Sequence, residues 1–501
     1  MSLAQPTTPP PPRTTGRHAF TLALLACVVP MFTVTMNNLV MTGALPSIGA
    51  DLRVGLDVLQ WFFNSYALVF AAGLPAAAAI GARLGNRQVY LAAVLLFAGA
   101  STVCALASDP AVLIAGRIVQ GVGAAAVVPL SLVLLVGSVP AAKQKLAVGL
   151  WSGLAGLALA AGAVIGGALT SGLNWRWIFW MNLPVAAVAV PLVLLVLRRS
   201  PRGTRPPDLL GMTLLGGAIA LVVWAVSESP RLGWLSPSPL SALAGATACL
   251  LVFVWWQRRT TQPLLPLSFY RNRQLLLSNL ACLTLYFGVF GSVFFLMQYL
   301  QGPMGYSPAE AGVRTLPWTC MPLLVAPLTG LLLARVRAGV VLAVAAVLQA
   351  IGLGWIALIA APDLPWLAVV PAMVVAGTGM GMEFAVTNEV AMRSVPEDQQ
   401  NMAAAYRNTA AEIGGVLGVA ILTTVFTVSR AGAGPDPDVG FVAGLSPVLG
   451  VGALVVLLGA GLGVLLARRE RQDLDRPAPS GGATDEDEDA ADREPVPSAQ
   501  A

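Results

Sequence analysis

The sequence has very few of the residues on which enzymes and soluble proteins depend. Only 11% of its 501 residues are charged, against roughly 25% in an average soluble domain, and it contains one histidine. Its five cysteines show neither Cys-x-x-Cys pairs nor Cys/His metal spacing, and there is no Gly-x-x-x-x-Gly-Lys-Ser/Thr nucleotide loop. We therefore expect no enzyme activity, no metal, no cofactor and no direct use of ATP.

The sequence is instead dominated by apolar residues in long runs. They make up 56% of the chain, and the mean hydropathy of +0.76 is typical of an integral membrane protein. A helix that crosses a bilayer needs about 20 mostly apolar residues. Such runs predict fourteen transmembrane helices, at 20–44, 58–79, 88–108, 111–136, 146–170, 177–197, 208–227, 239–257, 275–299, 311–334, 338–360, 365–392, 403–427 and 444–467.

The positions of the basic residues indicate how these helices are oriented. If the N-terminus is cytoplasmic, 23 of the 29 Lys and Arg residues fall in cytoplasmic segments and 5 in outer segments. Because cytoplasmic loops collect Lys and Arg, this split predicts that both termini lie in the cytoplasm. The net charge of +5 therefore reflects membrane topology, and we expect a lipid bilayer and no nucleic acid as a partner.

The order of apolar runs and basic loops predicts an all-α protein with a 6+2+6 layout. The predicted segments are a disordered cytoplasmic tail at 1–19, a six-helix half at 20–197, a linker with two inserted spans at 198–257, a cytoplasmic linker at 258–274, a second six-helix half at 275–467 and an acidic, disordered cytoplasmic tail at 468–501. Repeats of this kind place a substrate site at the bilayer midplane between the halves.

Arg117 lies inside the fourth predicted span, in the stretch LIAGRIVQGVGAAAVVPL. An arginine there costs roughly 2.5–3.5 kcal/mol on insertion scales, so it marks a functional site. At 1.5 Å per residue Arg117 lies ~9 Å and Asn37 of the first span ~12 Å from the outer surface, so the Asn37 carbonyl can accept a hydrogen bond from the guanidinium. We interpret Arg117 as a permanent charge in the substrate site that also biases proton-carrying groups. Asn37 and Gln120 are its polar neighbours, and the small residues from Gly121 onward let its helix move.

The acidic residues deep in the membrane belong to the second half. Glu383 in the twelfth span and Glu412 in the thirteenth both lie ~13 Å from the cytoplasmic surface by the same helical rise. A carboxyl group at this depth can bind and release a proton near neutral pH, so both are candidate proton carriers. A structural, protonated glutamate bonded to a neighbouring helix is the alternative. Glu389 and Arg407 are placed nearer the cytoplasmic interface.

Two further patterns each admit two interpretations. Trp61, Asn64 and Tyr66 open the second span, either as part of an interfacial aromatic belt or as a lining of the substrate site. Gly162 and Gly166 are four residues apart in the fifth span, a spacing that lets two helices approach closely. That surface serves either fixed packing or sliding between two states.

In these stretches the sequence resembles the major facilitator superfamily, and within it the fourteen-span drug:proton antiporter branch of bacterial antibiotic and multidrug exporters. The similar stretches are NNLVMTGALPSI in span 1, GARLGNRQVY between spans 2 and 3, RIVQGVGAAAVVP in span 4, AGAVIGGAL in span 5 and NWRWIFWMNLP at the start of span 6. The resemblance implies the major facilitator fold. The candidate gating residues are Arg83, Gly85, Arg87, Gly121, Gly162, Gly166 and Gly167.

The sequence departs from the family pattern at three positions. Asn37 and Ala82 stand where the family usually has acidic residues, and Ala163 stands where its antiporter motif has proline. These departures concern the route of the proton. They favour the second half for that route, with Glu383 and then Glu412 as carriers.

The resemblance and the buried charges predict proton-coupled export of a small amphipathic organic compound, an antibiotic or related secondary metabolite, for self-resistance or secretion. Because Arg117 lacks the usual acidic partner, a neutral or anionic compound is favoured. We expect a monomer in the cell membrane whose partners are the substrate, protons and lipid. An importer or uniporter of the same fold, and a non-transporting scaffold or sensor, are the alternatives.

Overall fold

The computed structural model describes residues 19–197, 208–233, 235–260, 263, 271–396, 400–430 and 436–474. In these residues all regular secondary structure is helical. The predicted tails at 1–18 and from 475 onward lie outside the described residues, as do 198–207 and 264–270 of the predicted linkers.

The helices follow the apolar runs of the sequence. The first group is α1 (Ala19–Leu52), α2 (Leu56–Leu84), α3 (Asn86–Leu106), α4 (Pro110–Ser138), α5 (Ala141–Gly172), α6 (Trp177–Trp180) and α7 (Asn182–Val196), followed by the pair α8 (Leu209–Leu232) and α9 (Pro237–Arg259). The last group is α11 (Arg273–Gln301), α12 (Pro308–Arg314), α13 (Leu316–Thr319), α14 (Met321–Leu333), α15 (Ala338–Ile359), α16 (Trp366–Arg393), α17 (Gln400–Arg430) and α18 (Pro437–Leu474). Each predicted span overlaps one of these helices or a set of adjoining ones.

Twelve helical segments in the described residues are long and apolar enough to cross a membrane. Their outer faces carry large apolar side chains: Leu195, Leu331 and Leu358 are 71%, 72% and 88% exposed. A soluble monomer rarely exposes so much contiguous apolar surface, whereas a bilayer covers it. The fold is therefore that of a multi-pass membrane protein.

Local signals set where several helices begin. At the start of α4, the Asp109 side chain accepts a hydrogen bond from the backbone N–H of Ala111 at 2.7 Å. At α12, Ser307 and Glu310 form a capping box, in which each side chain accepts a hydrogen bond from the other residue's backbone N–H. These caps satisfy backbone groups that the first helical turn leaves without partners.

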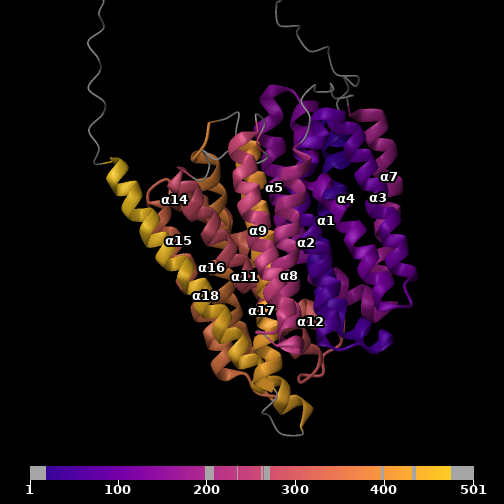
Figure 1. Ribbon diagram of the computed structural model, residues 1–501, viewed down its shortest axis with the longest axis vertical. Coiled ribbons are helices and arrows are strands. Elements are labelled where there is room, and N and C mark those ends of the chain that lie inside the picture. The colour runs from indigo at the N-terminus through magenta and orange to yellow at the C-terminus, as the bar shows by residue number, and fades with distance from the viewer. Residues whose placement is uncertain are drawn as a thin grey trace, which may run out of the picture.

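The helices form two bundles with an inserted pair between them (Figure 1). In the first bundle, α1–α7, α1 packs on α5 and α7, and α4 packs on α2 and α3. In the second bundle, α11–α18, α11 packs on α17 and α18, and α15 packs on α16 and α18. The inserted pair, α8 and α9, lies in front of both in Figure 1, and α8 contacts α2 and α17.

The two bundles meet along α2 and α17 and, at one end of the molecule, at α5 and α12. We call this the α12 end; in Figure 1 it is at the bottom, and α18 finishes toward the opposite end. Gln301 Nε2 donates to the Gly43 carbonyl at 3.0 Å, and the Ala309 N–H donates to Ser171 Oγ at 2.9 Å. These hydrogen bonds join the bundles directly at the α12 end.

The last helix is longer than predicted. Residues 468–474 were expected to belong to a disordered tail, but α18 continues through them to Leu474. The Glu470 carboxylate accepts a hydrogen bond from the Gly339 N–H at 3.1 Å, which ties this extension to the start of α15. Arg471 in the last turn also favours the helix, because a cation is stabilised near a helix C-terminus.

Candidate functional site

Arg117 is fully buried inside the first bundle. Its Nε donates to the Phe62 carbonyl at 2.9 Å, and its Nη1 donates to Asn37 Oδ1 and to Gln120 Oε1, the latter at 2.9 Å. The guanidinium carbon lies 4.2 Å from the centroid of the Tyr66 ring. The contact with Asn37 that helical depth predicted is therefore present. Hydrogen bonds from a charged donor are about twice as strong as neutral ones, which explains how the buried charge is tolerated.

The polar contacts of Arg117 extend through the bundle. Gln120 Nε2 donates to Ser101 Oγ at 2.7 Å, and Asn182 Nδ2 donates to the same hydroxyl at 3.1 Å. Arg117, Asn37, Gln120, Ser101 and Asn182 form what we call the arginine cluster, contributed by α4, α1, α3 and α7. Among the described residues no carboxylate forms a salt bridge with Arg117, and its Nη2 has no hydrogen-bond partner.

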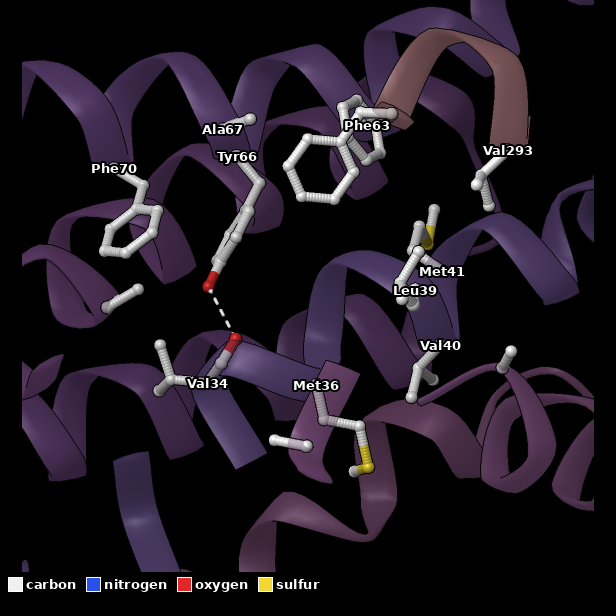
Figure 2. Packing of buried hydrophobic residues seen from close by; sticks show 14 of the residues in the cluster. Val34, Met36, Leu39, Val40, Met41, Phe63, Tyr66, Ala67, Phe70 and Val293 are labelled. Carbon is white, nitrogen blue, oxygen red and sulfur yellow. Dashed lines mark hydrogen bonds between the residues drawn. The ribbon is translucent and has the colours of Figure 1, made fainter. Parts of the chain in front are cut away.

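The three polar and aromatic residues at the start of α2 have different surroundings. Tyr66 is fully buried, and its hydroxyl donates to the Val34 carbonyl at 3.2 Å (Figure 2). Asn64 is also fully buried, and neither of its amide atoms has a partner in the described structure. Trp61 is only half-buried. Because Tyr66 and Asn64 are buried, they do not belong to an interfacial aromatic belt. The ring of Tyr66 instead makes a cation–π contact with the guanidinium of Arg117.

Glu383 lies inside the second bundle. It is fully buried on α16, and neither carboxylate oxygen has a hydrogen-bond partner among the described residues. A Cβ atom built on Gly459 of α18 would lie 2.9 Å from Thr284 Oγ1 of α11 and 3.5 Å from Glu383 Oε1. The carboxyl group therefore faces α11 and α18 of its own bundle.

Glu412 occupies a different environment from Glu383. It is half-buried on α17, close enough for Coulomb interaction with Tyr66 of the first bundle and with Arg407 and Tyr286 of the second. Tyr286 and Thr284 lie two positions apart on α11 and so point to opposite sides of that helix. The two acids have similar predicted depths, but Glu383 is near the Thr284 side of α11 and Glu412 is near the Tyr286 side.

Arg407 was expected near the cytoplasmic interface, but the structure buries it to 3% exposure. Its guanidinium carbon lies 4.8 Å from the Phe384 ring centroid and 5.7 Å from that of Tyr286. Its Nη1 donates to Asn408 Oδ1 at 3.1 Å, and its Nη2 donates to Thr387 Oγ1 at 3.4 Å. Two aromatic faces and two polar side chains thus replace the water that an interfacial arginine would contact.

A small apolar cavity adjoins Arg407 where the bundles meet. Its lining residues, from α1, α11 and α16, are Leu39, Leu285, Tyr286, Val289, Phe290, Met380 and Phe384. The Tyr286 and Phe290 ring centroids are 5.4 Å apart, and Phe63 of α2 lies 5.8 Å from Phe290 across the bundle boundary. Figure 2 shows Phe63 and Leu39 near Val293 of α11 at this boundary. We call this group the aromatic cavity. Its volume is about 10 Å³, room for no more than one water molecule, so the flat, apolar part of an organic compound would enter only when the bundles separate and widen it.

No pattern in the sequence indicates the aromatic cavity directly. Tyr286 and Phe290 are four residues apart in the stretch YFGVF, which also fits an ordinary apolar helix face. Phe384 follows Glu383 directly, so the acid and the ring point to different sides of α16.

The glycines predicted to act in gating fall into two groups. A Cβ atom on Gly121 would lie 2.7 Å from the Tyr66 carbonyl, and one on Gly162 or Gly166 would lie 2.8 or 2.7 Å from a backbone carbonyl of α1. These three glycines permit close packing inside the first bundle. A Cβ on Gly167 would lie 2.2 Å from the Pro308 carbonyl of α12, so only Gly167 contacts the second bundle directly.

The predicted gate between α2 and α3 lies within the first bundle. Gly85 has a φ of +99°, a backbone conformation that residues with a side chain rarely adopt. Arg83 is exposed, whereas Arg87 is buried and its Nη2 donates to the Leu194 carbonyl of α7 at 2.6 Å. This contact fixes the α2–α3 turn against α7. The Ala82 side chain lies outside the described part of the chain.

Comparison with known proteins places this geometry in a family. Residues 27–419 match the profile of the Major Facilitator Superfamily. The chain is 34% identical over 406 residues to the multidrug resistance protein Stp of Mycobacterium tuberculosis (strain CDC 1551 / Oshkosh), which covers 81% of this chain and 75% of that protein. It is 33% identical to the tetracenomycin C resistance and export protein of Streptomyces glaucescens, over 82% and 76% of the two chains.

A third relative and two solved structures agree with these matches. The methylenomycin A resistance protein of Streptomyces coelicolor is 32% identical, over 85% of this chain and 88% of that one. A bacterial homolog of the human lysosomal transporter Spinster superposes with a TM-score of 0.66 at 17% identity, over 93% of this chain and all of that chain. The POT family transporter PepTSo gives a TM-score of 0.66 at 14% identity, over 92% and 99%. At these identities the two structures support the fold alone.

Proposed function

The chain belongs to the Major Facilitator Superfamily, and on this basis we propose that it exports a small amphipathic organic compound from the cell in exchange for protons. It is a multi-pass protein of the cell membrane. The names of its relatives describe resistance to and export of antibiotics, which supports an antibiotic or related secondary metabolite as the substrate. The biological role would be self-resistance or secretion.

We propose fourteen spans with both termini in the cytoplasm. The twelve apolar segments do not include complete α2 and α5, which have 29 and 32 residues. At 1.5 Å per residue these helices are roughly 44 and 48 Å long, which exceeds the ~30 Å hydrocarbon core. The distribution of Lys and Arg supports this orientation, in which the α12 end faces outward.

The proposed mechanism rests on the positions of the buried charged residues in the two bundles. The first bundle holds Arg117, a cation that cannot be neutralised in the protein and that has no acidic partner among the described residues. The second bundle holds Glu383, which can be neutralised by one proton, and Glu412 beside the bundle boundary. We assign proton binding to the two acids, and to Arg117 a fixed potential that acts on both substrate and protons.

The proposed substrate site lies between the arginine cluster and the aromatic cavity. Tyr66 lies on the arginine-cluster side of this site, because its ring contacts the Arg117 guanidinium, and Glu412 of the second bundle lies near it. The aromatic cavity would take the apolar part of the compound. Asn37, Gln120 and Asn64 offer polar atoms, and Trp61 lines the outer part of the path. A permanent cation without an acid favours a neutral or anionic compound.

Membrane energetics supports coupling to protons. One proton that enters at 100 mV releases ~2.3 kcal/mol, and a tenfold concentration ratio corresponds to about 1.4 kcal/mol. One-for-one exchange with a neutral compound therefore supports roughly a 40-fold gradient per 100 mV. An anion that leaves adds a second favourable charge movement, whereas a departing monovalent cation cancels the electrical contribution.

The gating residues follow from the same arrangement. Hydrogen bonds and the Gly167–Pro308 contact join the bundles at the α12 end, so export requires these contacts to separate. We propose that Gly162 and Gly166 keep α5 packed against α1 throughout the cycle. At Gly167, in contrast, α5 separates from α12. Gly121 keeps α4 close to α2. At the opposite end of the molecule, opening and closing would be controlled by Arg83, Gly85 and Arg87.

Reconstituted protein in vesicles with an imposed pH gradient tests the proposal. Tetracenomycin C serves as a probe, and proton movement is followed with an entrapped pH-sensitive dye. The wild-type protein should move the probe against its gradient only when protons flow the other way, and Glu383→Gln should lose this coupling. Glu389→Gln, which changes an exposed glutamate on the same helix, is the matched control and should retain it.

Two outcomes would favour the alternatives. Probe uptake that needs no pH gradient would indicate an importer or uniporter of the same fold. Unchanged coupling in a double variant, Arg117→Ala with Glu383→Gln, would contradict the mechanism. Transport restricted to lipophilic cations in a panel of compounds would overturn the preference for neutral and anionic substrates.

A further inference from the structure

A row of polar groups in the second bundle has no role in the substrate site. Glu383 on α16, Gln349 on α15 and Ser292 on α11 are all fully buried. Both carboxylate oxygens of Glu383, both amide atoms of Gln349 and the hydroxyl of Ser292 have no hydrogen-bond partner among the described residues. Each such buried group costs about 1–3 kcal/mol when it is left unbonded, so these five atoms together require partners.

Glycines connect these three side chains along the axis of the bundle. A Cβ atom on Gly288 of α11 would lie 3.3 Å from Gln349 Nε2 and 3.7 Å from the Gly452 carbonyl of α18. One on Gly452 would lie 3.1 Å from Ser292 Oγ. Together with Gly459 beside Glu383, these glycines bring α11 and α18 close to the three polar side chains, and the Val456 side chain of α18 packs against Gly288. The polar groups thus follow one line through the bundle interior.

The row spans roughly two fifths of the ~30 Å hydrocarbon core. Ser292 and Thr284, which neighbours Glu383, are eight residues apart on α11 and so differ in height by ~12 Å. Ser292 is nearer the α12 end, and Glu383 is nearer the opposite end, by their positions in α11 and α16. Beyond Ser292, the stacked rings of Phe295 and Phe426, 4.8 Å between centroids, close the bundle toward the α12 end.

At its other end the row reaches the charged residues near the substrate site. Thr387 lies one helical turn beyond Glu383 on α16, and its hydroxyl accepts a hydrogen bond from Arg407 Nη2 at 3.4 Å. Cys282 of α11 lies close enough to Glu383, Arg407 and Glu412 to interact with the charge of each. Cys282 is therefore the titratable group beside Glu383, and it lies between that acid and the pair Arg407 and Glu412.

Three side chains without partners in the described structure, on facing helices of one bundle, distinguish this row, because an isolated buried polar residue can bond to its own helix, whereas Asn64 is an unbonded residue of the first bundle. Gln298 of the same bundle donates its amide to the Phe294 carbonyl of its own helix at 3.2 Å. Ser101 donates to the Phe97 carbonyl one turn earlier at 2.7 Å. Gln349 and Ser292 make no such bonds, which leaves their polar atoms available to another molecule.

We propose that Ser292, Gln349 and Glu383 bind a file of water molecules through the interior of the second bundle, and that the coupling proton reaches Glu383 along this file. Water is the one ligand that can satisfy donors and acceptors in so narrow a polar space. A hydronium ion in the file gives up one O–H bond as one O–H bond forms on a Glu383 oxygen, and the file is left as neutral water. The proton then passes toward Thr387 and Glu412.

The proposal rests on proton-coupled export and gives the proton a path separate from that of the compound. The organic substrate would occupy the aromatic cavity on the Tyr286 side of α11, whereas the proton reaches Glu383 on the Thr284 side and crosses to Glu412 only afterwards. Gln349 and Ser292 act as positioning residues for water, and Glu383 is the group that carries the proton.

The test compares Gln349→Leu and Ser292→Ala with Glu383→Gln in vesicles loaded with tetracenomycin C. The two path variants should slow proton-driven transport at least about tenfold, which corresponds to ~1.4 kcal/mol in the barrier. They should leave exchange of labelled for unlabelled probe, without a pH gradient, within about twofold of wild type. Gln298→Leu is the matched control, because it removes a buried glutamine whose amide is already bonded within its own helix.

An infrared difference spectrum between low and high pH supplies a readout other than transport. The wild type should show the carbonyl band of a protonated carboxylic acid that disappears in Glu383→Gln. In Gln349→Leu the same band should remain but change frequency, because the hydrogen bonding around the acid has changed. Unfolding of a variant would appear as loss of the exchange reaction, in which case Gln349→Met, which is closer in shape, replaces it.

The results separate the two proposals. Loss of coupling in Glu383→Gln with normal coupling and an unshifted band in Gln349→Leu and Ser292→Ala would overturn the water file and leave proton-coupled export intact. Normal coupling in Glu383→Gln itself would overturn the proton-carrying role of Glu383, on which the file depends.

Discussion

Two buried ionisable residues, Arg117 of the first bundle and Glu383 of the second, are held in opposite ways. Arg117 of the first bundle donates hydrogen bonds to Phe62, Asn37 and Gln120 and lies against an aromatic ring. Glu383 of the second bundle is just as deeply buried, yet none of the described residues hydrogen-bonds to its carboxylate. One charge is stabilised by its surroundings, whereas the other can be removed by protonation.

This difference teaches how a transporter can divide its tasks between two similar halves. A charge that can neither leave nor lose its proton supplies a constant potential, and its dense hydrogen bonding makes the first bundle rigid. A carboxyl group without protein partners is free to change state, because no hydrogen bond has to break when the proton arrives. The predictions below test this division.

The largest expected effect is the stability loss in Arg117→Met. The substitution leaves the acceptor oxygens of Asn37, Gln120 and Phe62 buried without a donor, at about 1–3 kcal/mol each. We expect the free energy of unfolding to fall by about 3 kcal/mol or more, measured by chemical unfolding in detergent with circular dichroism. Glu383→Leu should change it by less than about 1 kcal/mol, because no protein hydrogen bond is lost. A similar decrease in the free energy of unfolding of both variants would contradict the difference between Arg117 and Glu383.

The next effect concerns the contact between the bundles. In Gly167→Val the new side chain meets the Pro308 carbonyl of α12, so the α12 end cannot close fully. We expect transport of tetracenomycin C to fall at least about tenfold, since a barrier of only ~1.4 kcal/mol suffices. Distances between spin labels on α5 and α12 should increase. Gly162→Val is the comparison variant: it affects packing inside the first bundle and should lower stability without the same increase.

A smaller effect is expected where the second bundle holds its own cation. Arg407 lies over the rings of Phe384 and Tyr286, and such contacts contribute about 0.5–2 kcal/mol each. Tyr286 also lines the aromatic cavity, so Tyr286→Leu removes a ring face from the proposed site and should weaken binding of tetracenomycin C by roughly threefold to tenfold, measured by quenching of tryptophan fluorescence. Tyr286→Phe keeps the ring and should bind like wild type. Equal affinity in the leucine variant would place the compound elsewhere.

The smallest effect belongs to an exposed ion pair of the first bundle. Asp51 accepts hydrogen bonds from Trp175 and from Arg176, at 2.9 and 2.8 Å, and these two donors lower the pKa of Asp51. A lowered pKa contributes stability above the unfolded value of about 4, and this contribution is lost as the pH falls through the folded pKa. Because both side chains are partly exposed, Asp51→Asn should cost less than about 1 kcal/mol at pH 7 and nothing in strong acid. A larger loss would show that exposed charges also hold the first bundle together.

Positions along the membrane normal could be predicted from the sequence, because helical rise is constant. Counting residues placed Asn37 beside Arg117, and the structure shows that contact. Apolar runs located the described helices to within five residues, apart from α1, which continues past 44 to Leu52, and α18, which begins at Pro437 and has a polar extension held by Glu470. The family also followed from short motifs, and the relatives are named for antibiotic resistance and export.

Rotation about the helix axes could not be predicted in the same way. Glu383 and Glu412 have nearly equal depths, but only tertiary packing shows that they lie on different sides of α11. The same limitation hid the burial of Arg407, since two aromatic rings from α11 and α16 must arrive together to cover it. Gln349 reads as one polar residue in an apolar helix, and its importance depends on glycines of two other helices.

The inserted pair has a mechanical consequence for any cycle in which the bundles separate. Met212 of α8 and Phe253 of α9 are buried in a cluster with Ala76 of α2 and Tyr406 of the second bundle, so the pair is attached to both moving parts. When α2 and α17 shift relative to each other, one of these attachments must slip. The bundle to which α8 and α9 stay attached then displaces more lipid than the other bundle when it moves. The two halves would therefore meet unequal viscous drag in the membrane.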